Sequence, residues 1–292
     1  MPQLLLILSH VVHGYVGNRA IVFPLQYCGW DADAINTTHF SNHPGYGSFE
    51  GSKTPASAVA DIIEGLEDIL NVNSYHLLVT GYAPTAETLQ VIIDKLKPLD
   101  VPWLMDPVLG DNGKLYVDSK LIPMYQDILR LGRVSLVTPN QFEFEMLVGE
   151  SFDLWSQLRQ AVIKFFEQYK VKHLVISLVI LEGKMWLIGA SSSEMFAVPI
   201  EEVPCHFSGL GDLFCAILAH NYYYTDYQLT PEILGDTVIK LTEVLQRSLT
   251  KAQSKDPQTK YVRDLDIVGL REVYVADYRD RVKNVKIIET TT

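Results

Sequence analysis

Short apolar runs alternate along this chain with stretches in which apolar residues recur at helical spacing. Such alternation predicts an α/β fold of βαβ units, with a mostly parallel central sheet and helices on both of its faces. Five of the apolar runs are typical of strands that are buried on both sides. They are Leu4–Leu8, His76–Thr80, Pro102–Met105, Val134–Val137 and Leu174–Ile180.

The same start signal predicts the beginning of two helices. Thr54–Pro55 and Thr230–Pro231 each place a threonine as N-cap before a proline at the first helical position. The second of these helices is expected to run to about Ala252. Three further segments have helical spacing of their apolar residues. They are Ala86–Lys97, Leu154–Tyr169 and Gly211–His220.

The remaining pattern concerns the C-terminal half. Met185–Ile188 and Glu194–Val198 predict a hairpin at one end of the sheet. The polar, proline-bearing stretch Lys251–Lys260 is expected to be a loop before a strand-like C-terminal tail. No internal repeat or low-complexity segment divides the chain, so a single domain over residues 1–292 is the prediction.

Composition and net charge limit the kinds of ligand or partner that we expect. Apolar residues make up 48% of the 292 residues and charged residues 20%, which is usual for a soluble domain. The net charge of -11 argues against nucleic acid as a partner, because an extended phosphate backbone needs clustered lysine and arginine. A nucleotide in a local pocket stays allowed, since Mg²⁺ and backbone N–H groups can offset its charge.

Cysteines and the N-terminus indicate the compartment. Cys28, Cys205 and Cys215 are odd in number and widely spaced, so neither a disulfide framework nor a zinc knuckle is indicated. The first apolar run is too short for a signal peptide or a membrane span. We therefore expect a cytoplasmic protein, with nuclear presence also allowed and no membrane partner.

In open α/β sheets, ligands bind outside the carboxyl ends of the strands, so polar groups there are the candidates. The strongest candidate is Gly209–Leu210–Gly211–Asp212, directly before an apolar helical segment. The glycines permit close backbone approach, and N–H groups at a helix start can hold an anion. Asp212 could then take a proton from a hydroxyl that attacks a phosphoryl group. A plain glycine turn with Asp212 as helix cap is the other interpretation.

Two further candidates follow buried strands. Asp106 and Asp111 flank a turn of proline and glycine, and both could reach a Mg²⁺–phosphate cluster. Taken alone, this segment is more often a polar turn. After the next strand, Thr138, Asn140 and Glu143 lie in a segment where Asn140 and Glu143 would share one side of a first helical turn. Taken alone, the segment is better explained by helix capping through Thr138 or Asn140, with Glu143 favouring the helix dipole.

The segment from Ser9 to Asn18 follows the first predicted strand. It lacks the G-x-G-x-x-G spacing, so it is not a dinucleotide fingerprint. His10 and His13 are not accompanied by further ligands at zinc-like spacing, and structural histidines are the expectation.

Taken in order, the segments SHVVHGYVGNRA, FPLQYCGWDADAINTTHFSNHPGYG, TGY, DPVLGD, TPNQFE and GLGDLF resemble the pyridoxal kinase family of the ribokinase-like superfamily. The resemblance runs from about Leu4 to His220 and is weaker beyond. FSNHPGYG, DPVLGD and TPNQFE are specific in combination, whereas GLGD alone indicates only the superfamily. The resemblance implies a ribokinase-like three-layer sandwich and ATP-dependent phosphorylation of a B6 vitamer. It also implies Mg²⁺, a monovalent cation (K⁺ or Na⁺) and a homodimer.

The resemblance assigns roles to matching positions. Asp212 would be the catalytic base, and Ser9 would hydrogen-bond the pyridine ring. Residues expected around the vitamin are Ser9, Val16, Phe40, Pro44, Tyr82 and Gly209. Residues expected around ATP are Asp106, Asn140, Gln141, Phe142, Glu143, Ser177, Leu178, Leu210 and Gly211. Residues expected at the metal are Asp106, Asp111, Thr138 and Glu143.

Three positions depart from the family pattern. Leu210 replaces a small residue such as threonine, Pro44 replaces threonine or serine, and Leu178 stands where a second hydroxyl is common. These changes keep two alternatives open. One is a related kinase for a hydroxymethylpyrimidine or a sugar, and the other is a weakly active or silent homologue that binds pyridoxal phosphate.

Overall fold

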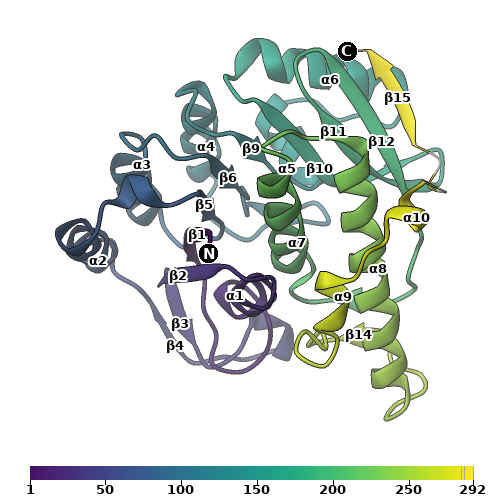
Figure 1. The fold of residues 1–292 in the computed structure, drawn as a ribbon, viewed down its shortest axis with the longest axis horizontal. Helices are drawn as coiled ribbons and strands as arrows, with labels where there is room; N and C mark the ends of the chain where they lie inside the picture. The colour runs from purple at the N-terminus through teal and green to yellow at the C-terminus, as the bar shows by residue number, and fades with distance from the viewer. Residues whose placement is uncertain (284, 286, 292) are drawn as a thin grey trace.

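The computed structural model describes residues 1–283, 285 and 287–291. Within that part of the chain, a nine-stranded sheet forms the centre of the molecule (Figure 1). From one edge to the other its strands are β15 (Ile288–Thr291), β12 (Glu194–Ile200), β11 (Lys184–Ala190), β10 (His173–Leu181), β9 (Leu136–Val137), β6 (Trp103–Met105), β5 (Leu77–Thr80), β1 (Gln3–Leu8) and β2 (Asp31–Asn36).

The strands from β10 to β2 run parallel, and β11, β12 and β15 continue the sheet in antiparallel order. The predicted hairpin is confirmed as β11 and β12, with β15 outside it. Three two-stranded sheets lie apart from the main sheet. They pair β3 (Thr38–Phe40) with β4 (Gly51–Lys53), β7 (Gly110–Asp111) with β8 (Lys114–Leu115), and β13 (His206–Phe207) with β14 (Tyr261–Val262).

Helices cover both faces of the sheet, as the alternating pattern predicts (Figure 1). One face carries α2 (Ala56–Ile69), α3 (Ala86–Leu96), α4 (Leu121–Arg130), α5 (Gln141–Val148) and α6 (Trp155–Gln168). The other carries α1 (Asn18–Tyr27), α7 (Leu210–Tyr224) and α8 (Pro231–Gln253). The short helices α9 (Glu272–Val275) and α10 (Arg279–Val282) follow. No helix of the described chain is long and apolar enough to cross a membrane.

Strand β1 shows why the sheet is buried on both sides. Leu5 and Ile7 pack into the core beneath α2 to α6, whereas Leu4, Leu6 and Leu8 pack against α1, α7 and α8. Successive side chains of a strand point to opposite faces, so a continuous apolar run feeds two cores at once.

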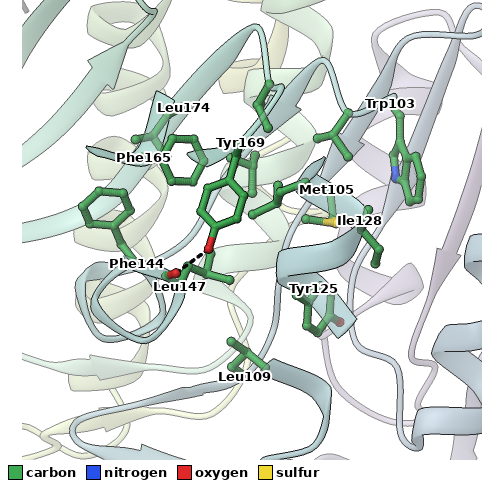
Figure 2. Packing of buried hydrophobic residues seen from close by; sticks show 14 of the residues in the cluster. Trp103, Met105, Leu109, Tyr125, Ile128, Phe144, Leu147, Phe165, Tyr169 and Leu174 are labelled. Atoms are coloured by element: carbon green, nitrogen blue, oxygen red, sulfur yellow. Dashed lines mark hydrogen bonds between the residues drawn. The ribbon is translucent and has the colours of Figure 1, made fainter. Parts of the chain in front are cut away.

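The core beneath α4, α5 and α6 anchors the loops that carry the candidate site (Figure 2). Leu109, in the middle of the DPVLGD segment, is fully buried there, and Phe144 of α5 packs against Phe165 of α6. The Tyr169 hydroxyl donates to the Leu147 carbonyl oxygen at 2.6 Å. Fully burying such an apolar side chain stabilises a fold by about 1.5–3 kcal/mol. Packing in this core therefore fixes the position of these loops.

Of the two helix-start predictions, one is confirmed and one is wrong. Thr230 caps α8, because its side-chain oxygen accepts from the Ile233 N–H, and Pro231 is the first helical residue. At the other site α2 begins at Ala56, one residue later than predicted. The Thr54 hydroxyl instead donates to the Asn36 carbonyl oxygen at 2.7 Å, which ties the segment to the end of β2.

The expected loop Lys251–Lys260 is also partly corrected. Helix α8 continues to Gln253, so only the remainder of that stretch is loop. The strand-like tail is more varied than expected, since β14, α9, α10 and β15 follow in turn.

Candidate active site

The carboxyl ends of the parallel strands gather the predicted residues at one edge of the sheet. Ser9 directly follows β1, Tyr82 follows β5 by two residues, Asp106 directly follows β6, and Thr138 directly follows β9. Ser177 lies in β10, further along in the same direction. These residues therefore lie along the edge of the sheet that the sequence analysis selected.

The GLGD segment forms the start of α7 and packs on the loop after β1. Gly209 is the N-cap, with a φ of 77°, and a Cβ there would lie 1.9 Å from the Tyr15 carbonyl oxygen. Asp212 accepts a hydrogen bond from the backbone N–H of Gly17. Gly17 is equally confined, because a Cβ on it would lie 2.1 Å from the Ser9 carbonyl oxygen. Only glycine permits both close approaches.

Asp212 is not the cap of its helix. It lies in the first turn, the N-cap being Gly209, and no side chain caps the helix start. Burial raises the pKa of Asp212 to about 6, against the lowering effect of the Gly17 N–H. A carboxyl that titrates near neutral pH is suited to accepting a proton at physiological pH.

Asp106 faces the same space as Asp212. Burial, followed by the charges of Glu143 and Asp212, raises the pKa of Asp106 well above its usual value. The Cys215 thiol donates to Asp106 Oδ2 at 3.7 Å, and a Cβ on Gly211 would lie 4.0 Å from the same oxygen. Three carboxyls thus crowd the region between β6, α5 and the start of α7.

Glu143 is fully engaged by backbone amides. Its Oε1 accepts from the N–H groups of Leu109 at 2.9 Å and Gly110 at 3.3 Å, and its Oε2 accepts from Asn140 at 2.9 Å. Burial raises the pKa of Glu143 to about 7, while these three donors oppose that rise. The side chain therefore holds two loops of the site together.

Asn140 caps α5, as the structural interpretation of this segment predicts. Its Oδ1 accepts from the Glu143 N–H at 3.0 Å and, together with the Glu143 side chain, completes a capping box. Its Nδ2 donates to the Gly110 carbonyl oxygen at 2.8 Å. Capping and joining the two loops are thus done by one side chain.

The other predicted metal residues point to different partners. Asp111 is exposed in the β7–β8 hairpin, and its two oxygens accept from the backbone and side-chain amides of Asn112 at 2.7 and 2.9 Å. Thr138 is buried, and its hydroxyl lies 3.5 Å from both the Met105 carbonyl oxygen and Cys215 Sγ. Among the described residues, no three His, Cys, Asp or Glu side chains form a ready metal cage.

Several of the residues expected around ATP lie on α5 and β10. Gln141 Oε1 accepts from the Ile180 N–H at 3.0 Å, and the Ser177 N–H donates to the Pro139 carbonyl oxygen at 2.9 Å. The pairing of β10 with β11 shifts register between Ile176 and Val179, which places Ser177 and Leu178 in an irregularity of the strand. Such bulges re-aim side chains next to active sites. Phe142 is half-buried and Leu178 is exposed.

Most of the residues expected around the vitamin are half-buried. Ser9, Val16, Phe40 and Tyr82 are all neither fully buried nor fully exposed. The Phe40 ring packs against Phe49 with centroids 4.7 Å apart, and the Tyr82 carbonyl oxygen accepts from the Thr37 hydroxyl at 2.8 Å. Pro44 is exposed and begins the 3-10 turn Pro44–Tyr46.

A family model described as phosphomethylpyrimidine kinase matches residues 41–227. The chain is 36% identical to pyridoxal kinase of Arabidopsis thaliana, over 85% of this chain and 82% of that protein. It is 32% identical to pyridoxal kinase of Homo sapiens, over 87% of each. The chain belongs to the pyridoxal kinase family. Its fold matches pyridoxal kinase of Leishmania donovani in complex with ADP and pyridoxine, with a TM-score of 0.82, 25% identity, and 99% and 98% of the two chains covered.

Within this family the ribokinase-like fold is confirmed, and the three departures can be located. Leu210 is the first residue of α7 and is half-buried, but it belongs to none of the apolar core clusters of the described chain. Pro44 lies at the start of a 3-10 turn, where its missing N–H is not needed by the turn. Leu178 is exposed on β10. None of the three displaces a carboxyl of the site.

Sequence reasoning missed several residues that support this pyridoxal kinase site. Gly17 donates to Asp212, and its place in a glycine-bearing loop after β1 was a usable signal. Cys215 follows Asp212 by three residues, so helical spacing alone puts both on one side of α7. Asp264 contacts Tyr15 and Tyr46 from far along the chain, and no local pattern indicates this.

Proposed function

We propose that the protein transfers the γ-phosphoryl group of ATP to the 5′-hydroxyl of pyridoxal, giving ADP and pyridoxal 5′-phosphate. The observation that carries this proposal is the Asp212 carboxyl in the first turn of α7, with a pKa raised by burial to about 6. Family membership supports the substrate class. Pyridoxine and pyridoxamine, which are bound in two of the L. donovani structures, are the further substrates that we expect.

In the proposed reaction, Asp212 accepts the proton of the vitamin hydroxyl. The vitamin hydroxyl oxygen attacks the γ-phosphorus, its proton passes to the Asp212 carboxylate, and the bond to the bridging β–γ oxygen breaks to release ADP. The first N–H groups of a helix lack intrahelical partners, so the start of α7 from Leu210 to Asp212 can receive the phosphates. Positioning and charge compensation then supply most of the acceleration.

A divalent cation fits the carboxyls of the site. Burial, and after it the charges of Glu143 and Asp212, raise the pKa of Asp106, which indicates negative charge in need of compensation. Kinases hold Mg²⁺ through one or two carboxylates together with substrate phosphates, and Asp106 would provide one of these carboxylates. Glu143 would act by holding the loops, because its oxygens already accept from three amides. When bound, Mg²⁺ neutralises charge on the phosphates.

The remaining expectations stay predictions. These are metal contacts by Asp111 and Thr138, a monovalent cation, a homodimer and a cytoplasmic location. The pyridine contact of Ser9 is supported by its position directly after β1, at the edge where Tyr82 and Asp106 also lie.

The test is a panel of ATP-dependent phosphorylation assays with pyridoxal, pyridoxine, pyridoxamine, hydroxymethylpyrimidine and ribose. We expect the B6 vitamers to be phosphorylated with the highest kcat/KM. A higher kcat/KM for hydroxymethylpyrimidine would instead favour the chemistry named by the family model. Binding of pyridoxal phosphate without turnover of any compound would identify a silent homologue and contradict the proposal.

A further inference from the structure

One segment far from the site in sequence joins two of its loops. We call Tyr261–Asp264 the C-terminal strut and Ser41–Glu50 the vitamin loop. The strut begins with β14, which pairs in parallel with β13, and the Ser208 N–H extends this pairing by donating to the Val262 carbonyl oxygen at 3.2 Å. Ser208 directly precedes Gly209, so the strut is attached to the Gly209–Asp212 segment at the start of α7.

The Asp264 carboxylate bridges two loops with its two oxygens. Oδ1 accepts from the Tyr15 N–H at 3.2 Å, and Oδ2 accepts from the Tyr46 hydroxyl. Tyr15 belongs to the loop whose Gly17 holds Asp212, and Tyr46 belongs to the vitamin loop. One side chain thus links the vitamin loop to the loop that contains Gly17.

Neighbouring contacts strengthen the same connection. The His43 ring nitrogen Nε2 lies 3.0 Å from the Arg263 carbonyl oxygen, and the Arg263 guanidinium lies over the Tyr46 ring, 5.6 Å from its centroid. Gly45 approaches so closely that a Cβ on it would lie 2.0 Å from the Tyr261 hydroxyl oxygen. That hydroxyl also lies 2.6 Å from Ser208 Oγ. The vitamin loop therefore contacts three of the four residues of the strut, namely Tyr261, Arg263 and Asp264.

The vitamin loop is also attached to the loop after β1, because the His13 N–H donates to the Ser41 carbonyl oxygen at 2.8 Å and His13 Nε2 lies 3.2 Å from the Tyr46 hydroxyl oxygen. Pro44, Gly45 and Tyr46 form a 3-10 turn without a buried residue, and every residue from Pro44 to Glu50 is exposed. At its base the loop continues the β3–β4 pairing through the Ser41 N–H, which donates to the Glu50 carbonyl oxygen at 2.7 Å. Because the residues from Pro44 to Glu50 are exposed, contacts of Gly45 and Tyr46 with the strut contribute to holding this part of the loop in place.

We propose that Asp264 is a positioning residue that holds the vitamin loop in place for substrate through Tyr46. The proposal rests on the proposed function, because the vitamin is the ligand that this loop would enclose. Asp264 touches no reacting atom in this role. Loss of the Tyr46–Asp264 contact should weaken capture of the vitamin while leaving ATP binding and the chemical step nearly intact.

The first test is Tyr46→Phe, which removes the hydroxyl and its contacts with Asp264 and His13 Nε2 but keeps the ring beneath Arg263. We expect the KM for pyridoxal to rise by about three- to tenfold, the latter corresponding to about 1.4 kcal/mol. The KM for ATP and the kcat at saturating pyridoxal should change by less than about twofold. Asp264→Asn should raise the pyridoxal KM similarly, and the double variant should be little worse than either single one, because contacting residues are not additive.

The matched control is Tyr75→Phe. Tyr75 donates its hydroxyl to Asp33 Oδ2 at 2.5 Å, so the substitution breaks another tyrosine–aspartate pair, between the segment before β5 and strand β2. We expect no change of the pyridoxal KM in this variant. An equal rise of KM in Tyr75→Phe would show a general loss of stability and would overturn the proposal.

The second test needs no catalysis and uses hydrogen exchange of the backbone amides in the ligand-free protein. Tyr46→Phe should speed exchange across the vitamin loop, and Tyr75→Phe should not. Unchanged exchange in the loop, or faster exchange with an unchanged pyridoxal KM, would overturn the positioning role. If wild-type protein fails to phosphorylate pyridoxal but Tyr46→Phe still loosens the loop, the proposed function fails while the contact itself stands.

Discussion

The role that we propose for Asp212 rests on its surroundings more than on its sequence motif. In the first turn of α7 it meets the Gly17 N–H, which stabilises the carboxylate, but burial dominates and raises its pKa to about 6. The N-cap of α7 is Gly209, so Asp212 does not cap the helix. Asp212 is thereby left with oxygens available to a substrate hydroxyl.

The first prediction at this scale concerns pH. Because the base must be ionised, kcat/KM for pyridoxal should fall about tenfold per unit as pH drops below the Asp212 pKa of about 6, and should be level above it. The residual rate of Asp212→Asn should lack this limb, which separates the enzyme carboxyl from protonation of ATP. A wild-type profile with the same shape as the Asp212→Asn profile would remove Asp212 from the base role.

The second prediction tests the departure at Leu210. The residue begins α7, is half-buried and lies outside the apolar core clusters, so replacing it should lose little packing. Leu210→Thr offers a hydroxyl to the phosphates. A hydrogen bond to a charged group contributes roughly 1.5–3 kcal/mol, so a gain in kcat of several-fold is expected after allowing for imperfect geometry.

Kinetics and a thermal melt should be measured together for Leu210→Thr. Faster turnover with an unchanged Tm agrees with the account. Slower turnover with a lower Tm would mean that Leu210 is a packing residue after all, with threonine losing apolar burial.

At the scale of elements, the DPVLGD turn and the start of α5 behave as one unit. Glu143 accepts from Leu109 and Gly110 in the turn and from Asn140 at the cap, and Asn140 donates back to the Gly110 carbonyl oxygen. The sequence offered capping and metal binding as alternatives for these residues. The structure shows capping, and the same contacts bring the turn to the edge where Asp106 lies.

The third prediction separates a positioning carboxyl from a metal-facing one. Glu143→Gln places an amide N–H₂ against backbone donors, so it should lower the Tm, in keeping with a cost of about 1–3 kcal/mol for an unsatisfied buried donor. Asp111→Ala, at an exposed position, should leave the Tm unchanged and raise the Mg²⁺ concentration needed for half-maximal rate. An unchanged Mg²⁺ dependence in Asp111→Ala would make this aspartate only a turn residue.

Helices and strands could be predicted from the sequence where their own residues determine them. The double-sided apolar runs located β1, β5, β6, β9 and β10, and the Thr230–Pro231 signal located α8. Strand β2 (DADAIN) was not predicted, because it is a polar edge strand that pairs with β1 alone. Thr54 failed as a cap because a tertiary partner, the Asn36 carbonyl oxygen, took its hydroxyl.

At the scale of the whole molecule, the site depends on chain topology. Parallel order brings the ends of β1, β5, β6 and β9 to one edge, which the alternating pattern foretold. The contacts of the strut could not be predicted from the sequence. Asp264 and Tyr15 are 249 residues apart, and their contact follows from the path of the chain after α8. Long-range contacts of this kind leave no periodic trace in the sequence.

The most direct test of the central claim is a single turnover, with enzyme in excess over pyridoxal and saturating Mg²⁺–ATP, followed by formation of pyridoxal 5′-phosphate. Wild-type protein should form the product stoichiometrically, and Asp212→Asn should form it about 10²–10⁴-fold more slowly. Calorimetry should show that Asp212→Asn still binds ATP and pyridoxal, because the amide keeps the shape of the side chain. Product formation by Asp212→Asn within about threefold of the wild-type rate, or none by either protein, would contradict the account.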